Sequence, residues 1–500
     1  MWLKRRHVVL IMLFVLYFSV RLFFSLQSTE FNTDYSYFAL RQIEHIKQTG
    51  LPLTHDELSY GGRNFLVLPF YFYLLAFFTL FLPKIIGIKI ITNLLASTLI
   101  IAVYLVCNRV LKKRRISIIC SVMAATMPIY INETLNNINP LSILLPGSLF
   151  LLYFFLNLRE KNAINYVIPL SIALILASSG SFILMFSIVV YLILKFLDKR
   201  EISKIRLEFA SFFFLLSIWL NILFYKYAFQ THGFSIIQRN LPTQLLNTYF
   251  SGLNLQTILL GIGVFPVLLG LYTASLYLFR KKSENMLLFI SLAVSIFGLL
   301  WLKLVAISMA LAFLGVALVV LFGQSLRSLL TLLKKTKFSK KTELIFNVIT
   351  IILITIQVIP AVYLMYEESN QSYTNEYIDG FKWLALNTPN SSVVLGLPEE
   401  GHLITYYGNR TNVIDTDFLL VNDADARYND VFTFYSWKFK IPAIRILEKY
   451  NVDYVIVSDK LEKYGISQDV LNDESCFVPI YNKGIIIYRN RWNKDVCEGR

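Results

Sequence analysis

Asp34 and Arg41 are the first residues whose types and spacing could support catalysis. They follow an apolar stretch at residues 7–26, so both should lie just outside a membrane face. A carboxylate in that place can accept a proton from an acceptor hydroxyl. The separation of seven residues is about two helical turns, which puts both side chains on one helical face. An interfacial amphipathic helix whose charges simply face water explains the same spacing.

Five more ionisable residues stand near apolar stretches and are candidates for substrate binding or catalysis. They are Asp56, Arg63, Glu133, Arg239 and Lys303. Lys303 lies within an apolar run where a span should exit outward, and an ionisable residue there is a functional candidate. A lysine that snorkels to the interface is the alternative. The chain has no Cys/His metal spacing, phosphate-binding glycine loop or Gly-x-Ser-x-Gly motif, which weakens ATPase, redox and hydrolase interpretations.

The composition is that of a membrane protein. Of 500 residues, 56% are hydrophobic and only 16% are charged, which is too little charge for a soluble surface. The net charge of +15 is unevenly divided, because residues 1–365 hold 33 basic and 12 acidic residues and residues 366–500 hold 14 basic and 20 acidic residues. We therefore expect a transmembrane region at 1–365 and an extramembrane domain at 366–500. Nucleic acid is not an expected partner, since the positive charge belongs to the membrane region.

Eleven apolar stretches predict a multi-span α-helical membrane protein with about 11 spans. They cover residues 7–26, 85–107, 116–130, 141–158, 164–178, 181–197, 207–227, 253–279, 286–301, 304–325 and 344–364. A further run, Phe65–Phe81, contains Pro69 and many aromatic side chains, so we interpret it as an interfacial or re-entrant helix. The first external loop would then cover residues 27–84, and a loop of this length is usually functional.

Basic clusters predict the orientation of the chain in the cell membrane. They lie at residues 4–6, 109–115, 195–206, 280–282 and 327–341. Because Lys and Arg are retained on the cytoplasmic side, the N-terminus should be cytoplasmic and residues 366–500 extracellular. The first apolar stretch should be a retained anchor and not a cleaved signal peptide, since Arg21 interrupts it.

The composition of residues 366–500 predicts a small external α/β domain. Strands are predicted at 393–397, 454–458 and 484–488, and helices at 373–386 and 435–450. The Glu-Glu-Gly-His segment at 399–402 could contact substrate, but we expect an exposed turn. Cys476 and Cys497 could form an extracellular disulfide, whereas Cys107 and Cys120 should be apolar filler.

Six segments resemble, in the same order, the catalytic subunit of oligosaccharyltransferase. They are Asp34–Arg41 (Asp-aromatic-x-x-Phe-x-x-Arg), Asp56–Arg63 (Asp-x-x-Ser-Tyr-Gly-Gly-Arg), Pro128–Thr134, Trp383–Pro389, Asn409–Asp415 and Ile446–Val457. That subunit has the C-type (GT-C) glycosyltransferase fold, in which a multi-span enzyme uses polyprenyl-phosphate-linked sugars at the outer face of the membrane. The resemblance touches the first loop, the second loop and the C-terminal domain, and it implies the same fold here.

The chain departs from that family at three motifs. The second-loop acidic pair, which binds a divalent cation such as Mg²⁺ or Mn²⁺, is replaced by Asn-Asn-Ile-Asn-Pro at 136–140, with Glu133 as the nearby acid. The Trp-Trp-Asp-Tyr-Gly motif that reads the acceptor sequon is replaced by Leu-Pro-Glu-Glu-Gly at 397–401. No acid lies between Phe229 and Gly252, where a catalytic-loop Glu is expected. The resemblance thus implies a divalent cofactor for which this chain has an incomplete set of ligands. It still implies a lipid-linked donor, because none of the three departures concerns that donor.

The resemblance implies an inverting glycosyltransferase that moves a sugar from a polyprenyl-phosphate-linked donor to a glycan, lipid or protein acceptor. Asp34 would be the catalytic base, with Glu133 as a second catalytic candidate. The donor's phosphate would lie at the membrane interface, so cations should meet it there. The candidates for substrate binding are Arg41, Asp56, Arg63, Arg239 and Lys303. A transporter or flippase-like protein and a non-catalytic assembly protein, each with an external domain, are the alternatives.

Overall fold

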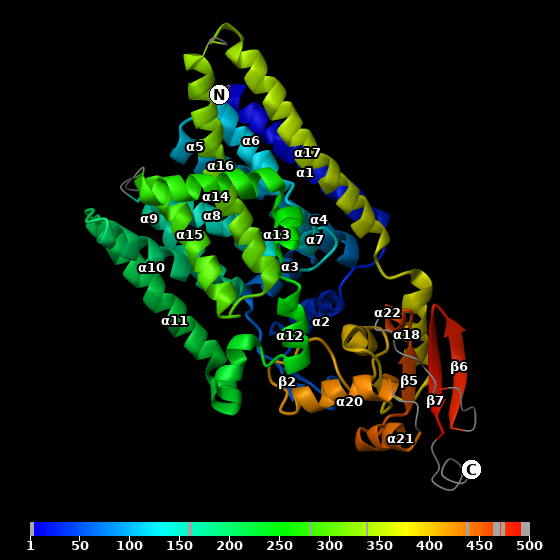
Figure 1. The fold of residues 1–500 in the computed structure, drawn as a ribbon. Coiled ribbons are helices and arrows are strands. Elements are labelled where there is room, and N and C mark those ends of the chain that lie inside the picture. Colours follow the sequence, from blue (N-terminus) through cyan, green and yellow to red (C-terminus); the bar gives the residue numbers. More distant parts are fainter. Residues whose placement is uncertain are drawn as a thin grey trace. The chain divides into compact units, whose positions relative to one another are not determined.

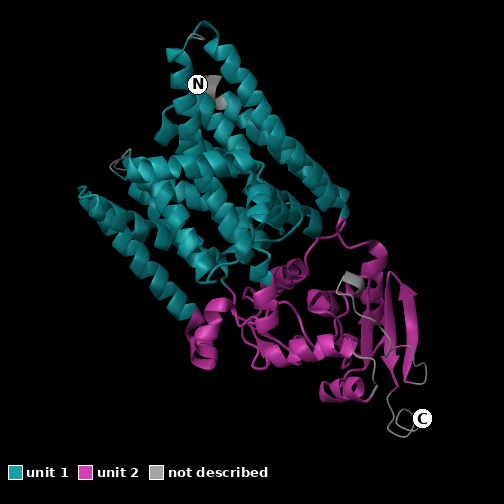
Figure 2. Ribbon diagram, viewed as in Figure 1, with its two compact units in different colours: residues 1–28, 68–224, 249–370 teal, residues 29–67, 225–248, 371–500 magenta. Residues whose placement is uncertain are grey.

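Two compact units make up the chain (Figure 2). The computed structural model describes residues 5–158, 163–280, 283–336, 339–436, 440–463, 471 and 476–491. Unit 1 comprises residues 1–28, 68–224 and 249–370, and unit 2 comprises residues 29–67, 225–248 and 371–500. Most of the predicted first loop therefore folds with the C-terminal segment, although the two are far apart in sequence.

Unit 1 is helical, and each of the eleven apolar stretches forms helix (Figure 1). Its helices are α1 (Arg5–Gln27), α3 (Phe70–Phe78), α4 (Lys84–Ser97), α5 (Leu99–Leu111), α6 (Arg114–Ala125), α7 (Pro128–Thr134), α8 (Leu141–Leu156), α9 (Ala163–Ala177), α10 (Phe182–Leu197), the first part of α11 (Lys204–His232), the end of α12 (Thr243–Ser251), α13 (Leu255–Ile262), α14 (Val264–Phe279), α15 (Glu284–Trp301), α16 (Ile307–Lys335) and α17 (Thr342–Asn370). Two 3₁₀ turns, η1 (Ser179–Ser181) and η3 (Ser339–Lys341), connect them.

The helices confirm a multi-span membrane protein. Among the described residues, seven helical segments are long and apolar enough to cross a membrane. The number becomes nine if each of the bent pairs α6–α7 and α13–α14 forms one span. Helices α8 and α9 are apolar but shorter. Length and composition therefore support seven to nine spans, where the apolar stretches alone predicted about eleven.

The aromatic run at 65–81 forms only the short helix α3, which begins directly after Pro69. Its nine residues rise about 14 Å, roughly half the thickness of the hydrocarbon core. A helix of that length does not cross a bilayer, which agrees with the interfacial or re-entrant interpretation.

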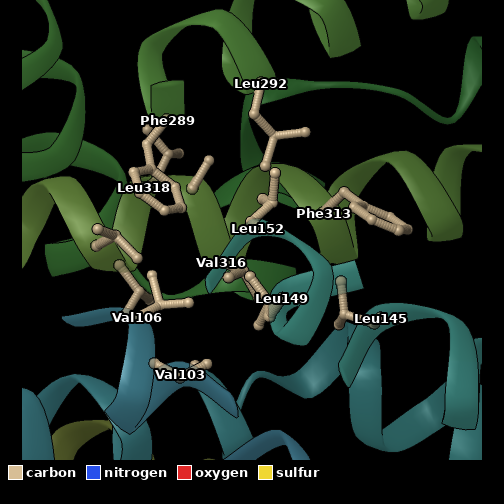
Figure 3. Close-up of a cluster of buried hydrophobic side chains, with 14 of the residues drawn as sticks. Val103, Val106, Leu145, Leu149, Leu152, Phe289, Leu292, Phe313, Val316 and Leu318 are labelled. Carbon is tan, nitrogen blue, oxygen red and sulfur yellow. The ribbon is translucent and has the colours of Figure 1, made fainter. Parts of the chain in front are cut away.

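The core of unit 1 surrounds helix α16. Nearly every side chain from Ala310 to Leu326 is buried. Figure 3 shows part of this cluster, to which Phe313 of α16 and Val106 of α5 belong. Cys107 and Cys120 are buried in the same cluster as free cysteines, as expected of apolar filler.

Unit 2 contains a five-stranded mixed sheet in the order β4-β3-β5-β7-β6. Its strands are β3 (Val393–Leu395), β4 (Thr411–Asn412), β5 (Tyr454–Val457), β6 (Phe477–Lys483) and β7 (Ile485–Asn490), and a separate hairpin pairs β1 (His55–Asp56) with β2 (Arg63–Asn64). Strand β3 runs parallel to β4 and β5, whereas β7 is antiparallel to β5 and β6. The β6–β7 hairpin turns at Gly484, whose positive φ of 70° suits glycine. This sheet confirms the predicted small α/β domain.

Helices flank the sheet and the loop segments of unit 2. They are α2 (Asp34–Thr49), the end of α11, the start of α12, α18 (Asn375–Asn387), α19 (Gly401–Tyr406), α20 (Ala424–Ser436), α21 (Lys440–Lys449) and α22 (Lys460–Lys463), with 3₁₀ turns η2 (Gly233–Gln238) and η4 (Pro398–Glu400). The helix predicted at 435–450 is thus represented by α20, which starts earlier, and α21; residues 437–439 lie outside the described residues. Cys476 is disulfide-bonded, and Cys497 lies outside the described residues.

Candidate active site

Asp34 is the first residue of α2, and its carboxylate is held by the first turn of α19. The backbone N–H groups of His402 and Leu403 donate to Asp34 Oδ1 over 3.0 and 3.1 Å. The Thr416 hydroxyl donates to Asp34 Oδ2 over 3.4 Å. All three donors come from the C-terminal segment, so the position of this carboxylate depends on the tertiary fold of unit 2.

Burial is the main influence on the acidity of Asp34, which is only 4% exposed. Burial raises the pKa of its carboxyl to about 6, although the charges of His402 and Lys460 oppose the rise. The nearby Asp415 carboxylate adds to the rise in this pKa. A carboxyl with that pKa is ionised at neutral pH and is a stronger base than an ordinary aspartate.

A cavity of about 610 Å³ opens beside Asp34 within unit 2. Its walls are formed by Asn32, Thr33, Asp34, Tyr35, Tyr373, Glu399, Thr416 and Lys460. The Lys460 ammonium donates to the Tyr373 hydroxyl over 3.0 Å and lies 4.4 Å from the centre of that ring. The cavity therefore presents a base, a cation and several polar groups that can hydrogen-bond a hydroxylated or phosphorylated ligand.

Three of the predicted substrate-binding residues are engaged in ion pairs. Arg41 donates to both carboxylate oxygens of Asp56, over 2.8 Å to Oδ1. Arg63 donates to Asp415 Oδ1 over 2.8 Å, and both side chains are buried. Burial alone would raise the pKa of Asp415, but Arg63 and His402 together hold this pKa below its usual value. The Arg41–Asp56 pair joins two parts of the first loop, and the Arg63–Asp415 pair joins this loop to the C-terminal segment of unit 2.

Arg239 is exposed and directly follows η2 in a left-handed conformation, with φ of 54°. Its charge acts on Tyr35, a residue of the cavity wall. Among the predicted cations of unit 2, Arg239 is thus the one that is both exposed and close to the cavity.

Glu133 and Lys303 belong to unit 1. The Glu133 carboxylate accepts from the Asn139 amide over 2.7 Å and is hydrogen-bonded to Ser308. Lys303 lies in the break between α15 and α16, with its ammonium 5.6 Å from the centre of the Phe250 ring. Neither residue is among those that line the cavity of unit 2.

The expectation of an exposed turn in the Glu-Glu-Gly-His segment is wrong. This segment forms the end of η4 and the start of α19, and Glu400 and His402 are almost completely buried. Glu400 accepts hydrogen bonds from the hydroxyls of Tyr377, over 2.6 Å, and Ser458, over 2.5 Å. Glu400 can be buried here because distant segments supply its hydrogen-bond partners.

Sequence analysis did not propose Tyr373, Asp415 or Lys460 as site residues, and it named the segment that contains His402 only as a possible substrate contact. Asp415 was available as a motif residue, whereas nothing in the local sequence around Tyr373 or Lys460 sets them apart. Only the fold reveals them, because they meet Asp34 from other segments.

The residues that the structure describes do not fit a resident divalent cation. Among the described residues, no group of three or more His, Cys, Asp or Glu side chains could hold a metal ion. Hard cations need several anionic oxygens. Asp34 is held by backbone N–H groups, and the second loop offers amides such as Asn137, which donates to the Asn132 carbonyl over 2.8 Å. We therefore derive no step through a metal.

Solved glycosyltransferase structures resemble the chain over nearly its whole length. The oligosaccharyltransferase of Archaeoglobus fulgidus in its apo form has a TM-score of 0.70 at 15% identity, covering 98% of this chain and 75% of that one. The structure of the same enzyme with Zn and sulfate has a TM-score of 0.64 at 14% identity, covering 95% of this chain and 73% of that one. Its structure with an inhibitory peptide and a dolichol-phosphate has a TM-score of 0.68 at 14% identity, covering 95% of this chain and 74% of that one. ArnT from Cupriavidus metallidurans, bound to undecaprenyl phosphate, gives 0.57 at 13% identity, covering 96% and 97% of the two chains.

Sequence similarity extends over a shorter region. The chain is 27% identical over 233 residues to a dolichyl-phosphooligosaccharide-protein glycotransferase of Methanocaldococcus jannaschii. That match covers 45% of this chain and 22% of the archaeal enzyme. No protein-family profile matches the chain.

The fold is that of the GT-C membrane glycosyltransferases, a class in which many apolar helices carry a smaller extramembrane domain. The archaeal oligosaccharyltransferase and ArnT both share it with this chain, which confirms the fold that the motifs implied.

Proposed function

We propose that the chain is an integral membrane glycosyltransferase that transfers a sugar or glycan from a polyprenyl-phosphate-linked donor to an acceptor on the outer face of the cell membrane. The observation that carries this proposal is the buried Asp34 carboxylate, with its pKa raised to about 6, in the wall of a cavity. The fold supports the donor class, because similar structures hold a dolichol-phosphate and undecaprenyl phosphate.

Asp34 is the catalytic base in this proposal. It takes the proton of the acceptor hydroxyl while that oxygen forms a bond to the anomeric carbon of the donor sugar. The bond between the anomeric carbon and the phosphate oxygen breaks, and the polyprenyl phosphate leaves with the bonding electrons. A single displacement inverts the anomeric configuration and needs no covalent enzyme intermediate.

Cations around the cavity would bind the donor phosphate. Lys460 lines the cavity, and Arg239 lies near its Tyr35 wall. Lys and Arg both suit phosphate oxygens, and Arg can bind two of them at once. In unit 1, Lys303 is a further candidate for the phosphate and Glu133 for a second acid–base role.

The acceptor in this proposal is a hydroxyl of a glycan or lipid. The segment that replaces the sequon-reading motif contains η4 and Leu397 before it. Leu397, Pro398 and Glu400 are buried, and Glu400 is hydrogen-bonded within the unit. These three side chains therefore offer a peptide no surface, and Glu399 is the residue of this segment that lines the cavity. The cavity offers hydroxyl and amide groups instead, including Asn32 and Thr416.

Replacing Asp34 tests the proposal. Asn keeps an oxygen that can accept the backbone N–H bonds but cannot act as a base at neutral pH, so Asp34→Asn should reduce sugar transfer at least 100-fold, on the order expected for loss of a general base. Transfer would be measured from polyprenyl-phosphate donors in membranes. The matched control is Glu57→Gln, an exposed acid of the same loop, which should transfer normally. Wild-type turnover in Asp34→Asn would refute the proposal.

A further inference from the structure

The side chain of His402 is buried without an obvious reason. It is 1% exposed. Neither ring nitrogen has a hydrogen-bond partner within the part of the chain that the structure describes. Buried polar groups are nearly always hydrogen-bonded, because they lose their bonds to water on burial. An apolar residue would fill this place at lower cost, so the imidazole must contribute something other than packing.

The surroundings of the imidazole are charged. Its Nε2 lies 3.7 Å from Oδ1 of Asp415, which is too long for a hydrogen bond but close enough for a strong charge interaction whenever the imidazole is protonated. The backbone N–H of His402 donates to Asp34 over 3.0 Å. The imidazole therefore lies beside Asp415, which is already paired with Arg63, and its charge also acts on the buried carboxylate of Asp34.

Among the charged neighbours of Asp34, His402 has the largest effect on the pKa of this carboxyl, whereas at Asp415 the effect of Arg63 is larger than that of His402. Phe38 packs 5.2 Å from the imidazole ring and carries no charge. Lys460 also acts on the charge of Asp34, but its ammonium is bound to Tyr373 at the cavity wall. Among the described residues, Asp34 accepts hydrogen bonds from two backbone N–H groups and a hydroxyl, and from no cation.

We propose that His402 is a positioning residue that keeps Asp34 ionised and correctly placed for the acceptor. This inference rests on the proposed role of Asp34 as a base. A protonated imidazole beside a buried carboxylate favours the charged form of that carboxylate. The backbone of the same residue holds the carboxylate in place. His402 does not touch the reacting atoms, and it acts only through Asp34.

The test is the pH profile of His402→Gln. Gln keeps the backbone N–H and a polar side chain but cannot carry charge, so the acidic limb of kcat/KM for sugar transfer should move to higher pH. A shift of about one pH unit lowers transfer about tenfold at pH 5, and the loss should fall to about twofold by pH 7 and disappear by pH 9. His55→Gln, which removes an exposed imidazole of the same unit, should leave the profile unchanged. An equal loss at every pH, or an unchanged profile, would overturn the proposal.

A second measurement does not depend on activity. Because folding raises the pKa of Asp34, its contribution to stability is present at low pH and is lost as pH rises through about 6. In the purified full chain, His402→Gln should move this fall in Tm to higher pH. The movement should disappear when Asp34→Asn is also present. A movement that persists there, or no movement at all, would refute the coupling of His402 to Asp34, even in a chain without transferase activity.

Discussion

Arg63 shows how a buried partner changes the interpretation of a charged residue. A cation that follows a membrane span is a candidate for binding phosphate, and the motif around Arg63 implied that role. In the structure its guanidinium donates to Asp415 over 2.8 Å, to the Ser59 hydroxyl over 2.8 Å and to the Asp417 carbonyl. Few donors are left for a ligand. We therefore assign Arg63 to the stability of unit 2 and propose Arg239 and Lys460 for the phosphate.

Removing the Arg63 guanidinium should destabilise the protein strongly. Arg63→Met would leave Asp415 charged and buried without its main partner, and breaking a buried pair in this way costs roughly 3–5 kcal/mol. Folding lowers the pKa of Asp415, so the loss of stability should have its full size above pH 5. The loss should become smaller as pH falls below the ordinary range of Asp pKa values. Unfolding of the purified full chain would measure it.

The control for Arg63→Met is Lys382→Met, which removes the partner of Asp379 in an exposed pair of the same unit. Exposed pairs contribute little, so this change should cost less than about 1 kcal/mol. Adding Asp415→Asn to Arg63→Met should recover part of the lost stability. Strictly additive losses in that double variant would contradict the assignment of a coupled buried pair.

The pattern of apolar residues predicts the helices and strands of this chain much better than it predicts which of them pack or pair with one another. The stretches at 85–107 and 304–325 became α4–α5 and α16, because a run that must satisfy its backbone in lipid can only be helical. The buried strand at 454–458 was placed to within one residue. In contrast, β4 (Thr411–Asn412) has only two polar residues and no apolar run to reveal it. It exists because β3 pairs with it.

Sequence analysis predicted Asp34 of the candidate site but not the residues that surround its carboxylate. Asp34 stood out because it follows a span, and its loop position required no knowledge of the fold. The segment containing His402 looked like an exposed turn, because four polar or small residues in a row are typical of turns. Its burial depends on α2 supplying Phe38 and Asp34 as neighbours. Such contacts between distant segments follow from tertiary packing and leave no local signal.

At the scale of the whole molecule, the basic loops predict a cytoplasmic N-terminus and an extracellular C-terminal domain. Cysteine labelling would test this orientation. In whole cells, Ser372→Cys should react with a membrane-impermeant thiol reagent, whereas Lys334→Cys, at the basic end of α16, should react only after lysis. The unmodified chain sets the background from its own cysteines. Labelling of Ser372→Cys only after lysis would refute the orientation.

The pH dependence of transfer tests the central claim most directly. If a buried Asp34 with its pKa near 6 is the base, then kcat/KM for sugar transfer from a polyprenyl-phosphate donor should rise about tenfold per pH unit below about 6 and level off above it. Asp34→Asn should lower the rate at least 100-fold and remove this limb from the residual activity, and Glu57→Gln should preserve both. A profile with no acidic limb between pH 5 and 7, or a limb that persists in Asp34→Asn, would contradict the account.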